Sequence, residues 1–253
     1  MGVKLERRKK RNWLLSVVYR LSRLRPTASP ETRLRVLLDL EWIFERLALE
    51  ESFHVFEPRK HPVRTSSLEF WGRRLLPTDR VLDLGCNKGE MTALLAGFCR
   101  EVVGIDTDAA AIAIAIAGNY AHNVSFVHGD GVAYFDAHVG RFDVVVVSHL
   151  IEHLDDPRPL LQAAARACRS VYVEVPDFER SLSNAYRHLL GSDLIYSDPD
   201  HVWEFDRREL RELVADCGLR VAEEQTSHGV IRMWCDGMSV SGPGPGGDRR
   251  AAQ

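Results

Sequence analysis

The stretch Val81-Leu-Asp-Leu-Gly-Cys-Asn-Lys-Gly-Glu90 decides the fold of this 253-residue chain. It predicts a buried strand that runs into a glycine-containing turn, which then opens a helix. Glycines in such a turn let the backbone approach a ligand closely where a side chain would block it. Asp106 lies 21 residues after Gly85, at the end of the next predicted strand, where an acid accepts hydrogen bonds from ribose hydroxyls. This spacing predicts a nucleotide-binding α/β unit.

Short apolar runs and helical segments alternate around this unit. The strands are predicted at 80–84, 101–105, 124–128, 142–147 and 170–175, and the helices between and after them at 91–96, 107–118, 155–167 and 206–217. The continuous apolar run FDVVVV at 142–147 is typical of a strand buried on both faces of a parallel sheet. Residues 219–225 and 230–235 predict a closing antiparallel pair. The pattern predicts a doubly wound, mostly parallel, seven-stranded α/β sheet.

The domain organisation is predicted from where this alternation begins and ends. Residues 1–75 form an N-terminal helical extension, with apolar residues at helical spacing over 31–52. Residues 76–240 form the α/β domain, and residues 176–204, with their prolines and aromatic residues, form a substrate-lid insertion near the strand ends. Residues 241–253 contain no core residues and predict a disordered tail.

The composition excludes several classes of protein. The chain is 45% hydrophobic and 27% charged, unlike a collagen, a coiled-coil rod or a fully disordered chain. Its five cysteines form no CxxC pair, which favours a reduced, cytoplasmic protein over a zinc ribbon or disulfide scaffold. Residues 1–25 carry nine basic residues and one acid, although the net charge is −3. The acidic body argues against a long nucleic-acid substrate. Residues 1–25, the basic head, are predicted to form a helix. This helix would pack on its own domain or on a homodimer partner, or it would contact an anionic surface.

The nucleotide loop resembles the first motif of the class I S-adenosylmethionine (SAM) dependent methyltransferases. Asp106 matches the ribose-binding acid of that family, Gly129-Asp130 matches the residues beside the adenine, and residues 142–157 match the motif of the fourth strand. Asn87 stands where the family usually has a middle glycine. Because asparagine tolerates positive φ better than most residues, we expect the turn to survive. The acid-bearing strand and the glycine loop are matched by Asp83, Gly85, Cys86 and Gly89.

The resemblance implies that residues 76–240 are a SAM-dependent methyltransferase with a Rossmann-like fold. A dinucleotide dehydrogenase is the competing interpretation of the loop, but it would need Gly-x-Gly-x-x-Gly, which is absent. A SAM-binding protein without turnover is the alternative outside the enzymes. The residues expected to bind SAM are Asp83, Gly85, Cys86, Asn87, Gly89, Asp106, Thr107, Asp130, Gly131 and Ser148.

Histidines and carboxylates follow the fourth predicted strand. If a helical turn begins at Ser148, then His149, Glu152 and His153 share one of its faces. His201 lies in a second acidic and aromatic segment, directly before a late helix. Ligands of open α/β sheets bind outside the carboxyl ends of the strands, so we predict His149, Glu152 and His153 as catalytic residues.

The same cluster resembles that of a narrower group, the small-RNA 2′-O-methyltransferases of the plant microRNA-capping type. They carry Glu-x-x-Glu-His after this strand and Asp-His before a late helix, and these side chains hold Mg²⁺ on two neighbouring ribose hydroxyls. Ubiquinone-pathway O-methyltransferases share the Glu-x-x-Glu-His motif. In this sequence His149 stands where that motif has its first glutamate. The resemblance implies a divalent metal of the Mg²⁺ or Mn²⁺ type on His149, Glu152, His153 and His201. Three imidazoles favour a softer metal such as Mn²⁺, Fe²⁺ or Zn²⁺. A histidine base without metal and a purely structural role are the alternatives.

Methyl transfer to an aliphatic hydroxyl requires help with its proton, because the pKa of such a hydroxyl is near the value of about 15.7 for bulk water. A histidine base or a metal gives that help. The cluster therefore predicts O-methylation of a small hydroxylated substrate, a sugar or glycan precursor. Tyr186, Tyr196 and Trp203 are predicted to stack on the sugar ring. An RNA end, with the basic head on its phosphates, is the alternative acceptor.

Overall fold

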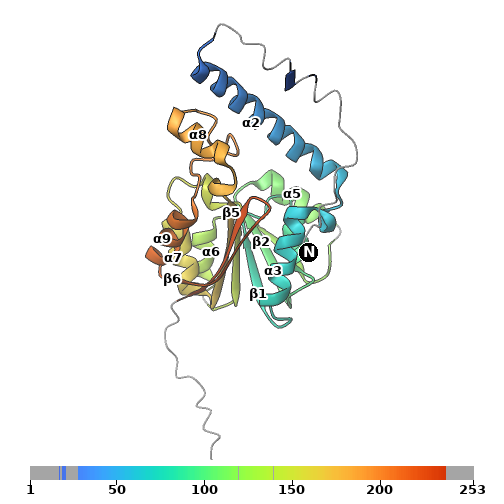
Figure 1. Ribbon diagram of the computed structural model, residues 1–253. Helices are drawn as coiled ribbons and strands as arrows, with labels where there is room; N and C mark the ends of the chain where they lie inside the picture. The colour runs from blue at the N-terminus through green and yellow to red at the C-terminus, as the bar shows by residue number, and fades with distance from the viewer. Residues whose placement is uncertain (1–16, 18, 21–27, 119, 139, 238–253) are drawn as a thin grey trace, which may run out of the picture.

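The computed structural model shows one seven-stranded sheet between two layers of helices, with a long helix set across one end (Figure 1). It describes residues 17, 19–20, 28–118, 120–138 and 140–237. The tail predicted at 241–253 lies outside these residues, and so does most of the predicted basic head at 1–25. In the described part of the chain, no helix combines the length and the apolar character needed to cross a membrane.

The strands follow the order β3-β2-β1-β4-β5-β7-β6. Strands β1 to β5 run parallel, and β7 is antiparallel to both of its neighbours. This arrangement confirms the predicted doubly wound sheet and its closing antiparallel pair. It also puts the switch point between β1 and β4, where open α/β sheets bind ligands. The strands are β1 (Arg80–Leu84), β2 (Glu101–Asp106), β3 (Val124–His128), β4 (Val144–Ser148), β5 (Ser170–Pro176), β6 (Leu219–Ser227) and β7 (Val230–Gly237).

Helices cover both faces of the sheet. Because successive side chains of a strand point to opposite faces, Val144 and Val146 of β4 pack with α3 and α4, whereas Val145 and Val147 pack with α6, α7 and α9. All four valines are fully buried, as the continuous apolar run predicts. The helices are α2 (Pro30–Val55), α3 (Pro62–Arg74), α4 (Glu90–Leu95), α5 (Ala109–Ala117), α6 (Gly131–Ala137), α7 (Arg158–Ala167), α8 (Leu182–Leu190) and α9 (Arg207–Asp216), with short 3-10 turns η1 (Pro58–Lys60), η2 (Ile151–His153) and η3 (Phe178–Arg180).

Helix α3 belongs to the core of the α/β domain. Phe70 and Trp71 are fully buried and pack on the ring of Tyr172 in β5, with ring centroids 5.4 and 5.7 Å away. Helix α2 differs, because Leu38 is its only buried residue. It lies beside α8, apart from the sheet (Figure 1). The predicted helical extension therefore contains one helix that completes the core and one that barely touches it.

The structure corrects the helical turn predicted to begin at Ser148. His149 has a φ of 50°, which an α-helix does not allow, and only Ile151–His153 form a 3-10 turn. The cause is backbone pairing, since the His149 N–H donates to the Glu174 carbonyl oxygen at 2.8 Å and extends the contact between β4 and β5. His149, Glu152 and His153 therefore do not share one α-helical face.

A buried ion pair joins α3, β5 and β7. Glu174 and Arg232 are 1% and 0% exposed, and their Oε2 and Nε atoms lie 3.0 Å apart. Arg232 also donates to Ser67 of α3, and Glu174 accepts hydrogen bonds from Ser67 and Tyr172. Burial alone would raise the pKa of Glu174, but His149, Arg232 and Ser67 outweigh it and lower the pKa to about 2. Glu174 is therefore a buried, charged carboxylate.

Replacing Arg232 by methionine is expected to lower the free energy of unfolding by about 3–5 kcal/mol, because the Glu174 charge loses its buried cationic partner. Urea unfolding followed by circular dichroism measures the change. Arg220→Met is the matched control, since it removes an exposed ion pair with Asp236 on the neighbouring strand and should barely move the midpoint. Equal losses in the two variants would contradict the importance of the buried pair.

Candidate active site

The loop after β1 turns in the left-handed region of backbone space. Gly85 and Gly89 have φ values of 70° and 81°, and Asn87 has a φ of 47°. A Cβ atom at Gly89 would collide with the ring of Phe126, so only glycine fits there. The prediction that the turn survives with Asn87 in place of a glycine is confirmed. The sequence thus keeps a tight turn whose backbone can approach a ligand.

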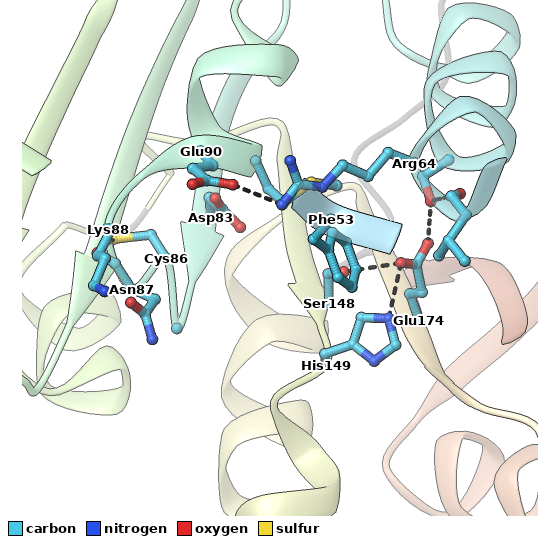
Figure 2. Close-up of a pocket in the computed structure, with 14 residues that line it drawn as sticks. Phe53, Arg64, Asp83, Cys86, Asn87, Lys88, Glu90, Ser148, His149 and Glu174 are labelled. Carbon is cyan, nitrogen blue, oxygen red and sulfur yellow. Dashed lines mark hydrogen bonds and ion pairs between the residues drawn. The ribbon is translucent and has the colours of Figure 1, made fainter. Parts of the chain in front are cut away.

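Two cavities meet at Gly85. They open at the switch point, one toward the β1 and β4 ends and one toward the β2 and β3 ends. The first has a volume of about 440 Å³ and is lined by residues that include Asp83, Gly85, Cys86, Asn87 and Ser148 (Figure 2). The second has a volume of about 270 Å³ and is lined by residues that include Asp106, Thr107, Asp130 and Gly131. Of the residues predicted to bind SAM, Gly89 alone lines neither cavity and instead forms the turn behind them.

Two carboxylates shape the loop. Asp106 accepts hydrogen bonds from the backbone N–H groups of Asn87 and Asp108, both at 2.8 Å, and so fixes the loop to the end of β2. Asp83 is buried and accepts a hydrogen bond from Thr92 at 2.6 Å. Burial raises the pKa of Asp83 to about 7, and the charge of Asp106 acts in the same direction. A cationic ligand in the larger cavity would favour the ionised form of Asp83.

His149 lies between two buried carboxylates. Its Nδ1 is 3.2 Å from Glu152 Oε1 and its Nε2 is 3.3 Å from Glu174 Oε1, as Figure 2 shows for Glu174. Burial alone would lower the pKa of His149, but the hydrogen bonds and charges of the two glutamates outweigh it and raise the pKa to about 10. The raised pKa favours the imidazolium form of His149, and a base or metal-ligand role would require the neutral imidazole. Both roles of His149 stay predictions.

Glu152, His153 and His201 form a compact cluster, with one ligand atom from each within 4.8 Å of the others. His153 Nδ1 donates to the Asp200 carbonyl oxygen at 3.2 Å, and His201 Nδ1 donates to Glu204 Oε1 at 3.0 Å. Such bonds orient metal-binding histidines and leave Nε2 for the metal. Glu152 is 1% exposed, and its Oε2 has no hydrogen-bond partner among the described residues. A buried carboxylate oxygen without a hydrogen-bond partner is unfavourable, and binding of a cation or a proton would remove that cost.

The segment that carries His201 is bound to the turn that carries Glu152. The backbone N–H groups of Val202 and Trp203 donate to the Glu152 carbonyl oxygen at 2.9 and 3.1 Å. These bonds bring together two segments that are distant in the sequence. The structure thus assembles three of the four predicted metal ligands, and His149 contacts the cluster only through Glu152.

The aromatic residues predicted to bind a sugar are not among the residues that line the two cavities. Tyr186 is on α8, and Tyr196 follows that helix. Trp203 lines a separate hollow beside α9, and its Nε1 donates to the Leu154 carbonyl oxygen at 2.9 Å. None of the three lines either cavity at the switch point. Their role in substrate binding stays a prediction.

Comparison with known proteins identifies the family. The sequence model of a family described as "Methyltransferase domain" matches residues 53–224, which is more than half of the chain. The chain belongs to this methyltransferase family. It is a SAM-dependent methyltransferase of class I, as the glycine loop and the strand order predict.

Relatives and solved structures agree with this assignment. The methyltransferase is similar to the ubiquinone biosynthesis O-methyltransferases of Thiobacillus denitrificans (27% identical over 159 residues, 60% of this chain and 68% of that protein) and Aromatoleum aromaticum (29% over 172 residues, 64% and 74%). Its fold is similar to those of SAM-dependent methyltransferases from Archaeoglobus fulgidus (TM-score 0.52, 19% identity, 69% of this chain and 93% of that chain) and Methanosarcina mazei (TM-score 0.53, 19%, 65% and 94%).

The larger cavity of the methyltransferase has a roof that sequence reasoning missed. Phe53 at the end of α2 and Arg64 and Ser67 of α3 line it, together with Glu174 of β5. Arg64 lies over the ring of Phe53, 5.2 Å from its centroid, and pairs with Glu90 at 2.6 Å (Figure 2). No local motif marks these residues, because they reach the cavity only through the packing of α3 on the sheet.

Replacing Asn87 by valine is expected to weaken cofactor binding by about tenfold, because a β-branched residue is strained at a φ of 47° and would displace the loop. Isothermal titration with S-adenosylhomocysteine measures the dissociation constant. Asn87→Gly is the matched control, since glycine adopts this φ freely and should preserve the affinity. If valine and glycine bind equally well, the turn does not control the cofactor site.

Proposed function

We propose that this enzyme transfers the methyl group of SAM to a hydroxyl of a small vicinal diol, of the kind found on a sugar or polyol precursor. The Glu152–His153–His201 cluster carries the proposal, because amine and carbon acceptors need no such group. Relatives that are named O-methyltransferases support an oxygen acceptor. The polar lining of the larger cavity, which includes Ser67, Ser148 and Glu174, suits a hydroxylated substrate.

SAM extends across the two cavities in this proposal. The adenosine part occupies the smaller cavity, where Asp106 faces the ribose hydroxyls and Asp130 the adenine. The methionine part and its methyl group occupy the larger cavity, where the carboxylate of Asp83 complements positive charge. Arg64, on the roof of that cavity, would exchange its pairing with Glu90 for the carboxylate of the cofactor. This orientation directs the methyl group toward the end of β4.

A divalent metal fits the cluster formed by Glu152, His153 and His201. The unpartnered Oε2 of Glu152 and the two Nε2 atoms left by the Nδ1 hydrogen bonds make a ligand set of two imidazoles and one carboxylate. Such a set suits Mn²⁺, Fe²⁺ or Zn²⁺ better than Mg²⁺. When bound, the metal would polarise adjacent hydroxyl oxygens and ease the loss of their protons.

The other residues of the site position the reactants. The sulfonium of SAM is already an electrophile, so the protein mainly has to hold the acceptor oxygen in line with the methyl group. His149 contacts both Glu152 and Glu174, and thereby connects the cluster to the wall of the larger cavity. Phe53 and Arg64 cover the cavity and reduce the access of water.

Chelation by EDTA is expected to lower turnover by about 100-fold, and Mn²⁺ should restore it. Binding of Mn²⁺ without substrate, measured by electron paramagnetic resonance of the free ion, gives a readout independent of activity. His201→Ala and Glu152→Gln should abolish this binding. His188→Ala, which removes an exposed histidine of α8, is the control and should bind normally. Normal Mn²⁺ binding by the cluster variants would rule out the site.

A cis-diol is expected to be methylated about 100-fold faster than the analogue that lacks one of its two hydroxyls, because a metal can hold two adjacent oxygens at once. A panel of sugars and their deoxy analogues, with a catechol and a short RNA end for comparison, can be assayed by mass spectrometry. Equal turnover of a diol and its deoxy analogue would contradict recognition of two oxygens. Turnover of the RNA end alone would contradict a small-molecule acceptor.

A further inference from the structure

Helix α2 has an apolar face that the rest of the described chain leaves uncovered. The side chains of this face are between 41% and 65% exposed. They lie on the side of the helix away from Leu38, Trp42 and Arg46, which contact the rest of the molecule. Figure 1 shows α2 apart from the sheet, next to α8. We call this surface the α2 face; its residues are Val36, Leu37, Leu40, Ile43, Phe44 and Leu47.

The attached side of α2 is mostly polar. Trp42 Nε1 donates to the Tyr196 carbonyl oxygen at 2.8 Å, and Arg46 pairs with Asp198 at 2.9 Å. Arg187 of α8 donates to the Leu38 carbonyl oxygen at 2.8 Å. An amphipathic helix normally turns its apolar stripe toward its own domain, and α2 does the reverse. A contiguous exposed apolar surface of this kind marks an interaction site.

The α2 face has the spacing of a helix-pairing seam. Leu37, Leu40, Phe44 and Leu47 follow one another at intervals of three, four and three residues, which is the spacing of apolar residues in a coiled coil. Val36 and Ile43 widen the seam on one side. At 26 residues, α2 is about 39 Å long, which is enough for several turns of contact.

The seam is complementary to itself when two copies lie antiparallel. A twofold axis midway between Leu40 and Phe44 sets Leu40 against Phe44 of the second copy and Leu37 against Leu47. The same axis sets Arg33 against Glu51 of the second copy, so two opposite-charge pairs flank the apolar centre. A parallel arrangement would instead set Arg33 against Arg33. The charges therefore select the antiparallel pairing.

We propose that α2 pairs with α2 of a second copy of this chain, in an antiparallel twofold dimer through the α2 face. The dimer would brace a helix that its own domain holds weakly. The polar side of α2 contacts residues 196–198, just before His201, and its end places Phe53 on the larger cavity. Association is thereby linked to the parts of the chain that surround the active site. This inference does not depend on the identity of the acceptor.

Light scattering coupled to size exclusion, on the full chain, measures the assembly. The wild type is expected to have twice the mass of one 28.6 kDa chain. Phe44→Glu should convert it to the monomer, with at least a hundredfold rise in the dissociation constant of the dimer. Ile116→Glu, which changes an exposed apolar residue of α5, is the matched control and should remain a dimer. A wild type that stays monomeric at about 100 µM, well above the micromolar range of ordinary association, would overturn the proposal.

Charge exchange tests the pairing itself and does not depend on a disruptive substitution. Arg33→Glu alone and Glu51→Arg alone should each weaken the dimer, because each sets like charges opposite one another twice. A mixture of the two single variants, and the double variant, should both regain the dimer. Failure of both to regain it would overturn the antiparallel arrangement.

Other occupants of the α2 face give different results. If deletion of residues 1–25 turns a monomer into a dimer, those residues cover the face and the proposal is wrong. It is equally wrong if the wild type is monomeric and binds anionic phosphatidylglycerol vesicles through Phe44. A dimer that survives Phe44→Glu would place the interface elsewhere. Circular dichroism of each variant confirms that the chain remains folded.

Discussion

The rest of the structure depends on the burial of one charged carboxylate, that of Glu174. A charge removed from water is tolerated only with close partners, and Glu174 takes them from three other parts of the chain. Ser67 comes from α3, Ser148 and His149 from the end of β4, and Arg232 from β7. These contacts require α3 to lie on the sheet and β7 to lie beside β5. Glu174 also lines the larger cavity, so the residue that orders these elements is part of the candidate site as well.

The position of the Glu152–His153–His201 cluster depends on the backbone of the same residue, Glu174. Pairing of the His149 N–H with the Glu174 carbonyl oxygen sets the φ of His149 at 50°, and that turn sends the chain into the short 3-10 segment that carries Glu152. The Glu152 carbonyl oxygen then holds the segment that carries His201. Apolar replacements of buried ion pairs are often neutral or stabilising, so stability alone does not explain why a chain would keep Glu174 and Arg232. Glu174 also lines the larger cavity, so the pair is connected to the candidate site as well as to the core.

The parts of this molecule that could be predicted from sequence are those specified over short distances. Ten residues around Gly85 are enough to predict the strand, the turn and the helix. The alternation of strands and helices along the chain is enough to predict the sheet. The helical turn expected at Ser148 was wrong because a contact with β5, distant in sequence, overrides local spacing. Arg64 and Glu174 were missed for the same reason, since neither belongs to a motif and both reach the cavity only through tertiary packing. His201 was found through a resemblance rather than through its own spacing.

Helix α2 shows that sequence periodicity can predict a helix without predicting what its apolar side will contact. Its leucines predict a helix correctly, but the pattern does not say which surface the apolar side will meet. In this fold Phe70 and Trp71 of α3, together with α4, cover one face of the sheet, and the core cluster described there contains no residue of α2. The domain holds α2 through polar side chains instead, such as Trp42 and Arg46. In the proposed dimer, a second copy of the chain would supply an apolar surface for α2 with complementary charge, and association would follow from how the domain core is filled.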